Sequence, residues 1–480
     1  MTPTLPPLIV DLDGTITYSD TLAESILLLA RKSPWTLLLL PLWLLRGRAA
    51  VKDEIAARVN LTGHPLPYRK DVIDYLRAQK AGGRRLVLAT AAHHTIAATV
   101  AQDTDLFESV LATRDGSNLK SHEKLRAIQQ LGDPFVYAGD SAADLPIWRS
   151  AAGAVLVGVS GRVKNALPKD LPVEASFDDK RPSLATWLRA LRIHQWLKNL
   201  LIFVPLLTGF AFLDAGKALA AVLAFLAFSL AASATYVLND FWDLANDRRH
   251  PRKRHRPFAS GELSIAQGMA AALSLMACAL LIAWNVSAAF LLVLLVYGAA
   301  TTSYSLWLKR FVLIDVIALS LLYTLRIVAG AMAIATAVSP WLLAFSVFVF
   351  LSLALLKRCA ELVSLLAEGQ LATTGRDYRM SDLQALWPLG ISSALCAAVV
   401  FGLFISAPAT QARYATPELL WLVTIGLLYW LSRLWIKTSR GEMHDDPIVF
   451  TLRDRGSQIT LFAMVLVTLL ARYLLVTLPL

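Results

Sequence analysis

The sequence predicts two units of different fold class: an N-terminal α/β domain with a Rossmann-like sheet, and a C-terminal all-α bundle that spans a membrane. Hydrophobic residues make up 56% of the 480 positions and charged residues 17%, which is more apolar than a soluble protein of this length. The apolar excess begins after about residue 180. Before that point, short strand-like runs end at polar residues; beyond it, long apolar stretches recur.

The formal net charge of +11 and the three cysteines exclude several classes. In a membrane protein, basic residues collect in cytoplasmic loops, where they attract anionic headgroups and phosphorylated substrates. Nucleic acid is not expected as a partner, because the basic residues lie in short loops between apolar stretches. Cys278, Cys359 and Cys396 show no CxxC spacing, so we expect neither a disulfide nor a zinc site. No signal peptide is recognisable, so the first domain is expected in the cytoplasm.

The first motif follows the apolar run 8–10, which we expect to form a buried parallel strand. It reads Asp11-Leu12-Asp13-Gly14-Thr15 and falls at the carboxyl end of the strand, where α/β sheets bind ligands. One carboxylate can attack phosphorus, and the other can protonate the leaving oxygen and then activate water. The pair therefore indicates phosphate chemistry, which also needs a cation.

Three later segments of the sequence supply the other parts of such a site, each after a strand-like run or in the loop that follows one. Thr90 offers a hydroxyl to a phosphate oxygen, and Lys124, with Lys120 as its competitor, offers a positive charge. Asp140 and Asp144 complete a set of oxygen ligands suited to Mg²⁺. A lone DxD pair is ordinarily a solvated turn, but four pieces in this order are not.

These pieces resemble the four ordered motifs of the haloacid dehalogenase superfamily. The resemblance implies a phosphatase with a small helical cap inserted after the first motif. It makes Asp11 the nucleophile and Asp13 the general acid and base, and it assigns phosphate binding to Thr90 and Lys124. The Mg²⁺ ligands that we expect are Asp11, Asp13, Asp140 and Asp144.

The expected cap contains the apolar run 34–45, which is too short to span a bilayer. Its two Trp residues and the flanking basic residues suit an interfacial segment; the latter are Arg31, Lys32, Arg46 and Arg48. The alternative is an ordinary cap helix buried against the core or the other domain. We favour membrane contact, because the expected substrate is a lipid.

Composition places the first domain at 1–175, a polar linker at 176–190 and the membrane domain at 191–480. Nine apolar spans are predicted, at about 200–212, 218–238, 265–284, 286–303, 311–332, 338–356, 386–406, 417–436 and 457–477. Alternate loops are rich in Arg and Lys, which predicts a cytoplasmic N-terminus and an external C-terminus, in a membrane of the bacterial inner (plasma) type.

The loop after the second span carries Asp240, Asp243 and Asp247, which are three and four residues apart and share one face of a helix. Carboxylates beside a bilayer are costly unless cations meet them. Mg²⁺ bridging a diphosphate would neutralise these carboxylates and orient the leaving group. Basic residues that can hold phosphate oxygens follow, namely Arg248, Arg249, Lys253, Arg254 and Arg256.

Two further polar clusters interrupt the apolar sequence. One comprises Tyr304, Lys309, Arg310 and Asp315, with Arg326 further along the same stretch, and the other comprises Lys357, Arg358 and Glu361. A single Lys or Arg here is ordinarily a consequence of membrane topology. Asp315 and Arg326 are different, because charges within a span are usually functional or paired.

Residues 239–247 match the NDxxDxxxD motif of the UbiA superfamily, and the resemblance extends from about Arg192 to the C-terminus. It implies nine transmembrane helices around a cavity, with two Asp-bearing loops that bind Mg²⁺ and diphosphate. The second loop usually carries a DxxD-like motif, and here a single Asp315 replaces it.

Residues 191–199, 250–257, 304–315 and 357–361 resemble a narrower branch, the decaprenyl-phosphate phosphoribosyltransferases. The resemblance implies that phosphoribose passes from phosphoribosyl pyrophosphate to a polyprenyl phosphate. Asp240, Asp243 and Asp247 would hold Mg²⁺, and Asp315 would bind ribose or metal. The residues expected to bind substrate are Lys198, Asn239, Lys253, Arg256, Tyr304, Lys309, Arg326, Lys357, Arg358 and Glu361.

The fusion fits this branch, since the transferase product still bears a 5-phosphate that an adjacent phosphatase would remove. The product would then be polyprenyl-phosphoryl ribose, a precursor for arabinan synthesis in the cell wall. The first alternative is a UbiA prenyltransferase with a prenyl diphosphate and an aromatic or other apolar acceptor. A transporter with a regulatory domain is the second, but it would need symmetric repeats with broken helices. The oligomeric state stays open, a homo-oligomer included.

Overall fold

The computed structural model describes residues 5–114, 119–132, 134–179, 182–367, 376–443 and 446–475. The chain divides into two compact units. The first comprises Met1–Ile193 together with Tyr236–Ser274, and the second comprises His194–Thr235 with Leu275–Leu480. The acidic motif at 239–247 therefore belongs to the same unit as the N-terminal residues.

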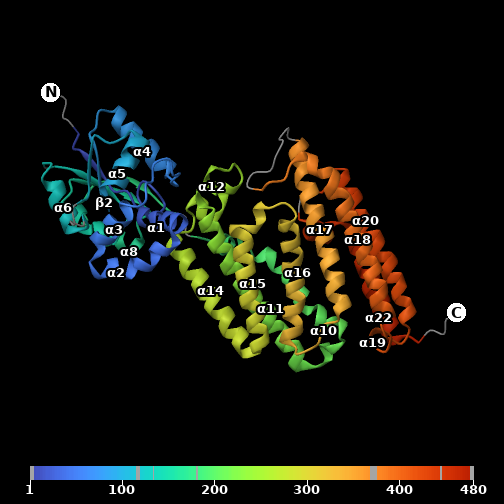
Figure 1. Cartoon of the computed structure of the whole chain (residues 1–480). Coiled ribbons are helices and arrows are strands. Elements are labelled where there is room, and N and C mark those ends of the chain that lie inside the picture. Colours follow the sequence, from blue (N-terminus) through green and yellow to red (C-terminus); the bar gives the residue numbers. More distant parts are fainter. Residues whose placement is uncertain are drawn as a thin grey trace. The chain divides into compact units, whose positions relative to one another are not determined.

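The first unit contains the predicted α/β fold, built on a six-stranded sheet in the order β3-β2-β1-β4-β5-β6 (Figure 1). All neighbouring strands are parallel. The strands are β1 (Leu8–Val10), β2 (Leu86–His93), β3 (Ser109–Thr113), β4 (Val136–Gly139), β5 (Gly153–Val157) and β6 (Val173–Phe177). Because β2 and β4 flank β1 on opposite sides, the strand order reverses beside β1, which is where open α/β sheets bind ligands.

Apolar residues on both faces bury this sheet. Leu8 and Val10 join one buried cluster with Leu88, whereas Ile9 and Val87 join another. This alternation follows from the two-residue period of a strand. The near-continuous apolar runs of the sequence are thus explained, since a parallel sheet is covered on both faces.

Helices surround the sheet and form the predicted cap between β1 and β2. The cap contains α1 (Thr21–Lys32), η1 (Pro34–Leu39), α2 (Leu40–Leu45) and α3 (Arg48–Ala56). The remaining helices of the N-terminal part are α4 (Lys70–Ala81), α5 (His94–Thr104), α6 (His122–Gln129), η2 (Ala142–Asp144), α7 (Leu145–Trp148), α8 (Gly161–Lys164) and α9 (Leu184–Ala190). Three short elements after the acidic motif complete the unit: α12 (Leu244–Arg249), η5 (Lys253–His255) and α13 (Pro257–Ser260).

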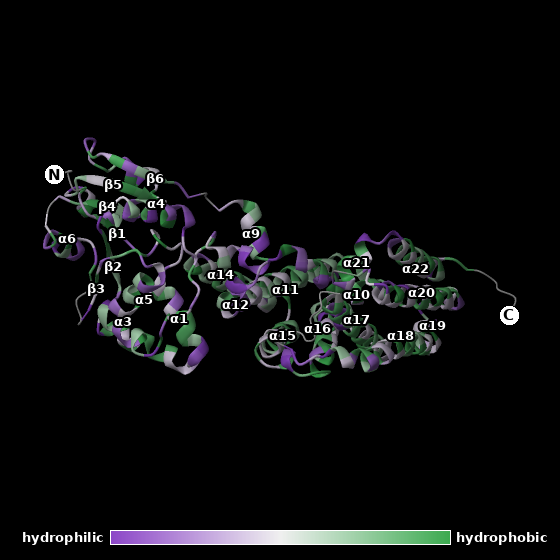
Figure 2. Cartoon of the chain, turned by 90° about the horizontal axis from the view of Figure 1, so that it is seen from above, coloured by the Kyte–Doolittle hydropathy of each residue, from purple (hydrophilic) through white to green (hydrophobic). Residues whose placement is uncertain are grey.

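Eight helices among the described residues are long and apolar enough to cross a membrane. They are α11 (Ala215–Trp242), α14 (Ile265–Val286), α15 (Ala288–Leu306), α16 (Ile314–Ala333), α17 (Pro340–Ala367), α18 (Leu383–Ser406), α20 (Leu420–Ser439) and α22 (Arg455–Tyr473). Hydrophobic residues dominate these helices (Figure 2). Short elements lie between some of them: η6 (Leu308–Arg310), η7 (Met380–Asp382), α19 (Pro408–Gln411), η8 (Pro417–Leu419) and α21 (Pro447–Arg453). The chain is a multi-pass membrane protein.

The first of the nine predicted spans differs from the expectation. Its residues form short pieces instead of one long helix: η3 (Ile193–Phe203), α10 (Val204–Thr208) and η4 (Ala211–Leu213). Pro205 stands at the start of α10 and lacks an N–H, and Phe210 after α10 is left-handed with φ 51°. Both features interrupt a continuous helix, so hydropathy alone overestimated this segment.

In the second unit, α16 packs against α15 and α17, and α17 packs against α18 and α20 (Figure 1). One glycine permits a very close approach. A Cβ at Gly330 on α16 would lie 2.0 Å from the backbone oxygen of Ile202. The segment η3 can therefore lie directly against α16, which brings polar residues of η3 into the interior of this unit.

Candidate active sites

Three carboxylates converge at the carboxyl ends of β1 and β4. Oxygen atoms of Asp11, Asp140 and Asp144 lie within 4.8 Å of one another. The Lys124 Nζ lies 2.8 Å from Asp11 Oδ2 and 3.8 Å from Asp144 Oδ1. It also donates to the Tyr137 hydroxyl at 3.0 Å, and that hydroxyl donates to Asp144 Oδ1 at 2.8 Å. The structure thus brings together the acidic and basic residues that the motifs predict.

Backbone geometry fixes the DxDGT loop against the Asp140 carboxylate. Gly14 has φ +77°, and a Cβ there would lie 2.2 Å from Asp140 Oδ2. Only glycine tolerates both conditions. The Asp13 carboxylate is turned to a different partner, since its Oδ1 accepts the backbone N–H of Thr21 at 2.8 Å. Among the described residues the metal-type cluster has three members, and Asp13, predicted as a fourth ligand, is not one of them.

Burial makes these carboxylates difficult to ionise. Burial, with the nearby charges of Asp11 and Asp144, raises the pKa of Asp140 to about 8. Burial and the charge of Asp20 raise the pKa of Asp13 to about 7. Two buried carboxylates and one half-buried carboxylate, which offer only oxygen ligands, are the donor set that Mg²⁺ prefers. The residues present therefore fit a divalent cation, which would offset their mutual repulsion.

A cavity of about 750 Å³ lies elsewhere, in the second unit, whereas the carboxylate site opens into a pocket of about 480 Å³. Lys120 lines that pocket but is exposed, while Lys124 is buried beside Asp11, which favours Lys124 over its competitor. Thr90 on β2 is fully buried, and its hydroxyl accepts the N–H of Ala92 at 3.0 Å. Ala92 itself lines the pocket, so the strand end predicted from Thr90 does reach it.

The acidic motif of the first unit forms a nearly continuous helical turn. Asp240 lies in the last turn of α11, Asp243 precedes α12, and Asp247 lies on α12. Asp240 and Asp247 are both buried and both contact Arg256, at 3.3 and 2.6 Å. Arg192 also pairs with Asp240. The predicted shared face is therefore real, with guanidinium groups against its carboxylates.

The other predicted residues near this motif are placed less tightly. Asn239 donates weakly to Asp243, with 3.5 Å between Nδ2 and Oδ2, and Lys253 on η5 is exposed. Asp240, Asp243 and Asp247 do not form a three-carboxylate cluster of the kind found at Asp11, in the described part of the chain. Their fit to a cation therefore rests on two buried carboxylates on one face with Asp243 between them.

A second buried polar cluster lies in the second unit, around Asp315 on α16. This carboxylate has no exposed surface, and it accepts hydrogen bonds from Tyr304 Oη at 2.7 Å and from Arg358 Nε at 2.6 Å. Arg358 also pairs with Glu361, whose other oxygen accepts Arg376 Nη1 at 3.2 Å. The sequence analysis named four of these five residues but placed them in two separate clusters, and Arg376 is the addition.

Arg326 occupies a separate network in the same unit. Its Nε donates to Asn199 Oδ1 at 2.9 Å, and its Nη2 donates to Tyr297 Oη at 3.1 Å. The rings of Phe228, Tyr297 and Tyr323 surround the guanidinium at 5.0–5.8 Å. These contacts link η3, α15 and α16, and the substrate-binding role of Arg326 stays a prediction. Lys309, on the short helix η6, is half-buried.

A third polar group in the second unit consists of Lys198, Lys357 and Asp446, of which only the two lysines were predicted. Lys198 on η3 and Lys357 on α17 both donate to Asp446 Oδ2, at 2.9 and 2.8 Å. Burial opposes ionisation of Asp446, but the two ammonium groups hold its pKa well below the usual range. We had identified both lysines but not the carboxylate between them.

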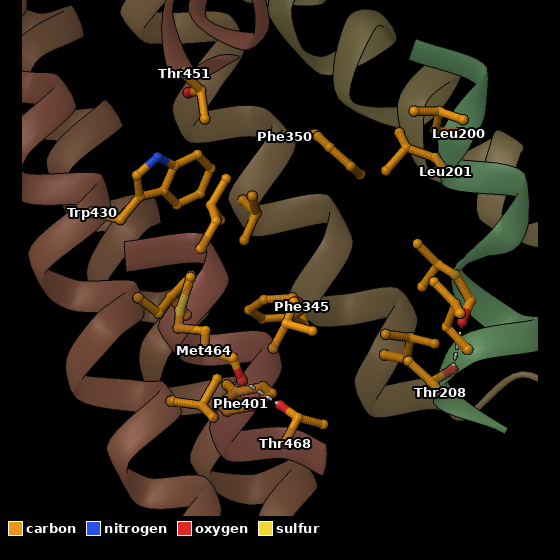
Figure 3. A pocket seen from close by; sticks show the side chains of 18 of the residues that line it. Leu200, Leu201, Thr208, Phe345, Phe350, Phe401, Trp430, Thr451, Met464 and Thr468 are labelled. Atoms are coloured by element: carbon orange, nitrogen blue, oxygen red, sulfur yellow. Dashed lines mark hydrogen bonds between the residues drawn. The ribbon is translucent and has the colours of Figure 1, made fainter. Parts of the chain in front are cut away.

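Lys198 also lines the large apolar cavity of the second unit. Figure 3 shows that Leu201 and Phe350 lie on opposite walls, with Phe345, Phe401 and Met464 deeper among the helices. Residues from η3, α10, α17, α18, α20 and α22 contribute to the walls. A long apolar chamber with an ammonium group at its wall suits an amphiphile that has an anionic head.

Residues missed by sequence reasoning share one property. Arg376 and Asp446 lie outside the quoted motifs, and Arg192 lies within one but had no role predicted for it. Long-range folding brings all three to their partners. Asp446 carried one usable signal, because an Asp directly before Pro447 at a helix start is a common cap. No comparable signal marks Arg376.

The chain matches the UbiA prenyltransferase family over residues 202–453 and the haloacid dehalogenase-like hydrolases over 8–149. It is similar to the uncharacterized protein y4nM of Sinorhizobium fredii, 40% identical over 94% of this chain and 88% of that protein. The decaprenyl-phosphate phosphoribosyltransferase of Corynebacterium glutamicum is 30% identical over 60% of this chain and 86% of its own length. A UbiA homolog from Archaeoglobus fulgidus, solved with GPP and Mg²⁺, has a TM-score of 0.46 at 16% identity, covering 59% of this chain and 99% of that one.

Proposed function

Because the chain belongs to the UbiA prenyltransferase family and carries a haloacid dehalogenase-like hydrolase domain, we propose that it synthesises polyprenyl-phosphoryl ribose in two steps. The membrane domain transfers 5-phosphoribose from phosphoribosyl pyrophosphate to a polyprenyl (decaprenyl) phosphate, and pyrophosphate leaves. The hydrolase domain then removes the 5-phosphate. The relatives named decaprenyl-phosphate phosphoribosyltransferase support this choice of donor and acceptor.

The observation that carries the proposal is the apolar cavity with Lys198 at its wall. Its volume of about 750 Å³ accommodates a section of a prenyl chain. Lys198 and Lys357, held together by Asp446, offer two ammonium groups for the phosphate at the head of the acceptor. A lipid phosphate satisfies both the apolar wall and the paired cations, whereas an aromatic acceptor leaves the lysines without a partner beyond Asp446.

The acidic helix end serves the donor. Asp240, Asp243 and Asp247 would hold Mg²⁺, and the bound ion would supply positive charge for the leaving pyrophosphate. Arg256 contacts both outer carboxylates and can turn to phosphate oxygens, as can Lys253. Tyr304, Lys309, Arg358 and Glu361 of the second unit, together with Asp315, are proposed to bind substrate.

The hydrolase step follows from the side chains around Asp11. One oxygen of Asp11 attacks phosphorus, and the bond from phosphorus to the ribose oxygen breaks. Asp13, which burial keeps protonated up to about pH 7, gives its proton to that leaving oxygen. Water, deprotonated by the same residue, then cleaves the aspartyl phosphate and releases inorganic phosphate. Lys124 offsets part of the charge of the phosphate, and Asp11, Asp140 and Asp144 would hold a Mg²⁺ ion that would offset the rest.

The test uses the full chain in nanodiscs with decaprenyl phosphate, Mg²⁺ and labelled phosphoribosyl pyrophosphate, with mass spectrometry of the lipids. The intact protein should yield polyprenyl-phosphoryl ribose and free phosphate. Asp11→Asn should yield the lipid that is heavier by one phosphate, and Asp243→Asn should yield neither. Turnover of a prenyl diphosphate with an aromatic acid, and none of the phosphoribosyl donor, would refute the proposal. Identical phosphorylated lipids from the intact protein and Asp11→Asn would refute its second step.

The membrane is proposed to be a bacterial inner membrane, with the hydrolase domain on the cytoplasmic side. Phosphoribosyl pyrophosphate is a soluble, highly charged donor that does not cross a bilayer, so both sites need to face the compartment that holds it. The basic loops of the sequence point to the same side. Protease protection of the hydrolase domain in sealed inverted and right-side-out vesicles measures this directly.

A further inference from the structure

The cap of the hydrolase domain presents an apolar surface made by η1 and α2. This interfacial segment, Pro34–Leu45, exposes 79% of Trp35, 73% of Leu38 and 85% of Leu45. Leu39, Leu42 and Leu44 are exposed as well. The segment is too short to span a bilayer, but the apolar surface is larger than scattered single residues would give.

The segment is held in place from behind, so its exposure is a property of the fold. Trp43 is buried and packs in one cluster with Leu29, Val51 and Ile55. The guanidinium of Arg58 lies over the Trp43 ring, 5.0 Å from its centroid. One face of the segment is therefore anchored to α1 and α3, and the opposite face is left outward.

The charged residues that flank the segment in the sequence are all basic. Arg31, Lys32, Arg46 and Arg48 flank it and are all exposed, and no acidic residue occurs between positions 25 and 52. Arg46 lies 3.9 Å from Glu54 and remains 61% exposed, so this contact does not neutralise it. Apolar residues with Trp, rimmed by cations, match the boundary between anionic headgroups and acyl chains.

The segment also forms part of the phosphatase pocket. Leu44 lies at the end of α2 and Arg48 at the start of α3, and both line the pocket that contains Asp11 and Asp13. The exposed apolar surface therefore continues directly into the catalytic pocket. The same chain carries eight membrane-crossing helices, which tether this domain to a bilayer.

We propose that the interfacial segment inserts into the headgroup region of an anionic bilayer and opens the phosphatase pocket toward phosphate esters held in that bilayer. The second part of this proposal, that the pocket takes a lipid-linked phosphate ester, rests on the proposed phosphatase activity. The first part, the contact of the segment with the bilayer, does not. Trp35, Leu38 and Leu45 enter the acyl boundary, and the four basic residues meet the headgroup phosphates.

Fluorescence of the full chain tests the contact. Cys278 and Cys396 are replaced by Ala, Cys359 is buried, and a single cysteine is introduced as Leu38→Cys or, for control, as Ala78→Cys on the exposed face of α4. Each is labelled with an environment-sensitive dye and reconstituted with phosphatidylglycerol and phosphatidylcholine, with or without lipids that carry a quencher. The label at position 38 should be blue-shifted and quenched by lipid, and the label at 78 should be neither. Equal quenching at both positions, or a blue shift at 38 without lipid quenching, which marks a protein partner, overturns the bilayer contact.

Activity tests the second half independently. Leu38→Glu combined with Leu45→Glu should lower turnover of the phosphoribosyl lipid in vesicles by about tenfold, because both carboxylates must leave the interface. Hydrolysis of soluble p-nitrophenyl phosphate should stay unchanged, as it should for the matched control Ala78→Glu. Equal loss on both substrates, or none on the lipid, overturns the role of the segment. A protein that hydrolyses neither substrate refutes the phosphatase activity itself, while the quenching result still decides the bilayer contact.

Discussion

A buried ion pair joins the cap of the hydrolase domain to α12, the helix that carries the end of the acidic motif, and both lie in the first unit. The Glu24 carboxylate on α1 accepts hydrogen bonds from Arg248 Nη2 and Nη1 of α12, at 2.6 and 3.1 Å. It also accepts one from Ser19 Oγ at 2.5 Å. His64 Nε2 lies 3.1 Å from its second oxygen. Burial opposes ionisation of Glu24, but His64 and Arg248 outweigh it and hold the pKa at about 2.

The magnitude follows from the difference between this pKa and the ordinary value of 4.5. A difference of about 2.5 pKa units corresponds to roughly 3 kcal/mol of stability for the ionised group. Because the folded-state pKa is lowered, this stability is fully present above about pH 4.5 and is lost as pH falls toward 2. Glu24→Gln should cost a similar amount at neutral pH, since Arg248 is left buried without its counter-charge.

Hydrogen exchange measured by mass spectrometry on the full chain gives the opening free energy of α1 and α12. Glu24→Gln should accelerate exchange in both helices at neutral pH, and Arg248→Met should do the same. The double variant should cost less than the two together, because the pair is coupled. The control is Asp74→Asn, which breaks an exposed pair with Arg77 and should change stability by less than about 0.5 kcal/mol. Exchange in α12 that is no faster in Glu24→Gln than in Asp74→Asn would refute the reasoning.

Three shorter predictions concern the two catalytic centres. Lys124→Gln should lower hydrolysis of p-nitrophenyl phosphate by at least about a hundredfold, as loss of a charge-stabilising donor does. Lys120→Gln, at an exposed residue, should leave most of the activity. A larger loss in Lys120→Gln than in Lys124→Gln would assign the phosphate-binding role to Lys120. Gly14→Ala should abolish the same activity, because its Cβ would displace Asp140, and wild-type turnover would contradict the geometry of the loop. Removal of Mg²⁺ with a chelator should stop transfer and hydrolysis, and added Mg²⁺ should restore both; transfer that persists in chelator would rule out the cation at Asp240.

Sequence reasoning succeeded where residues are close together in the chain or follow a strand. Strand β1 and the motif at Asp11 could be recognised because a parallel sheet brings strand ends to one edge. The helical spacing of Asp240 and Asp247 likewise predicted a shared face, which their common contact with Arg256 confirms. The cap was expected from the resemblance to the haloacid dehalogenase superfamily, although the anchoring role of Trp43 was not.

The remainder depended on distant contacts. Asp446 forms an ion pair with Lys198, which lies about half of the chain away in sequence. No pattern of residue spacing around either position predicts this pair. The first predicted span is apolar enough for a membrane helix, but Pro205 and the backbone of Phe210 divide it. Arg326 was expected at a ligand, because an intramembrane charge is usually functional or paired. The structure adds its hydrogen bonds to the distant residues Asn199 and Tyr297, which the sequence did not predict.

The surroundings of Arg326 also constrain how the protein is made. An arginine in the middle of a membrane helix costs about 2.5–3.5 kcal/mol when the helix is inserted alone. Its partners outside α16 are Asn199, Phe228 and Tyr297, and all of them precede α16 in the chain. When α16 emerges from the ribosome, the groups that receive its guanidinium have already been synthesised. Asp315 differs, because Arg358 follows it, so the start of α16 finds its counter-charge only after α17 has been translated.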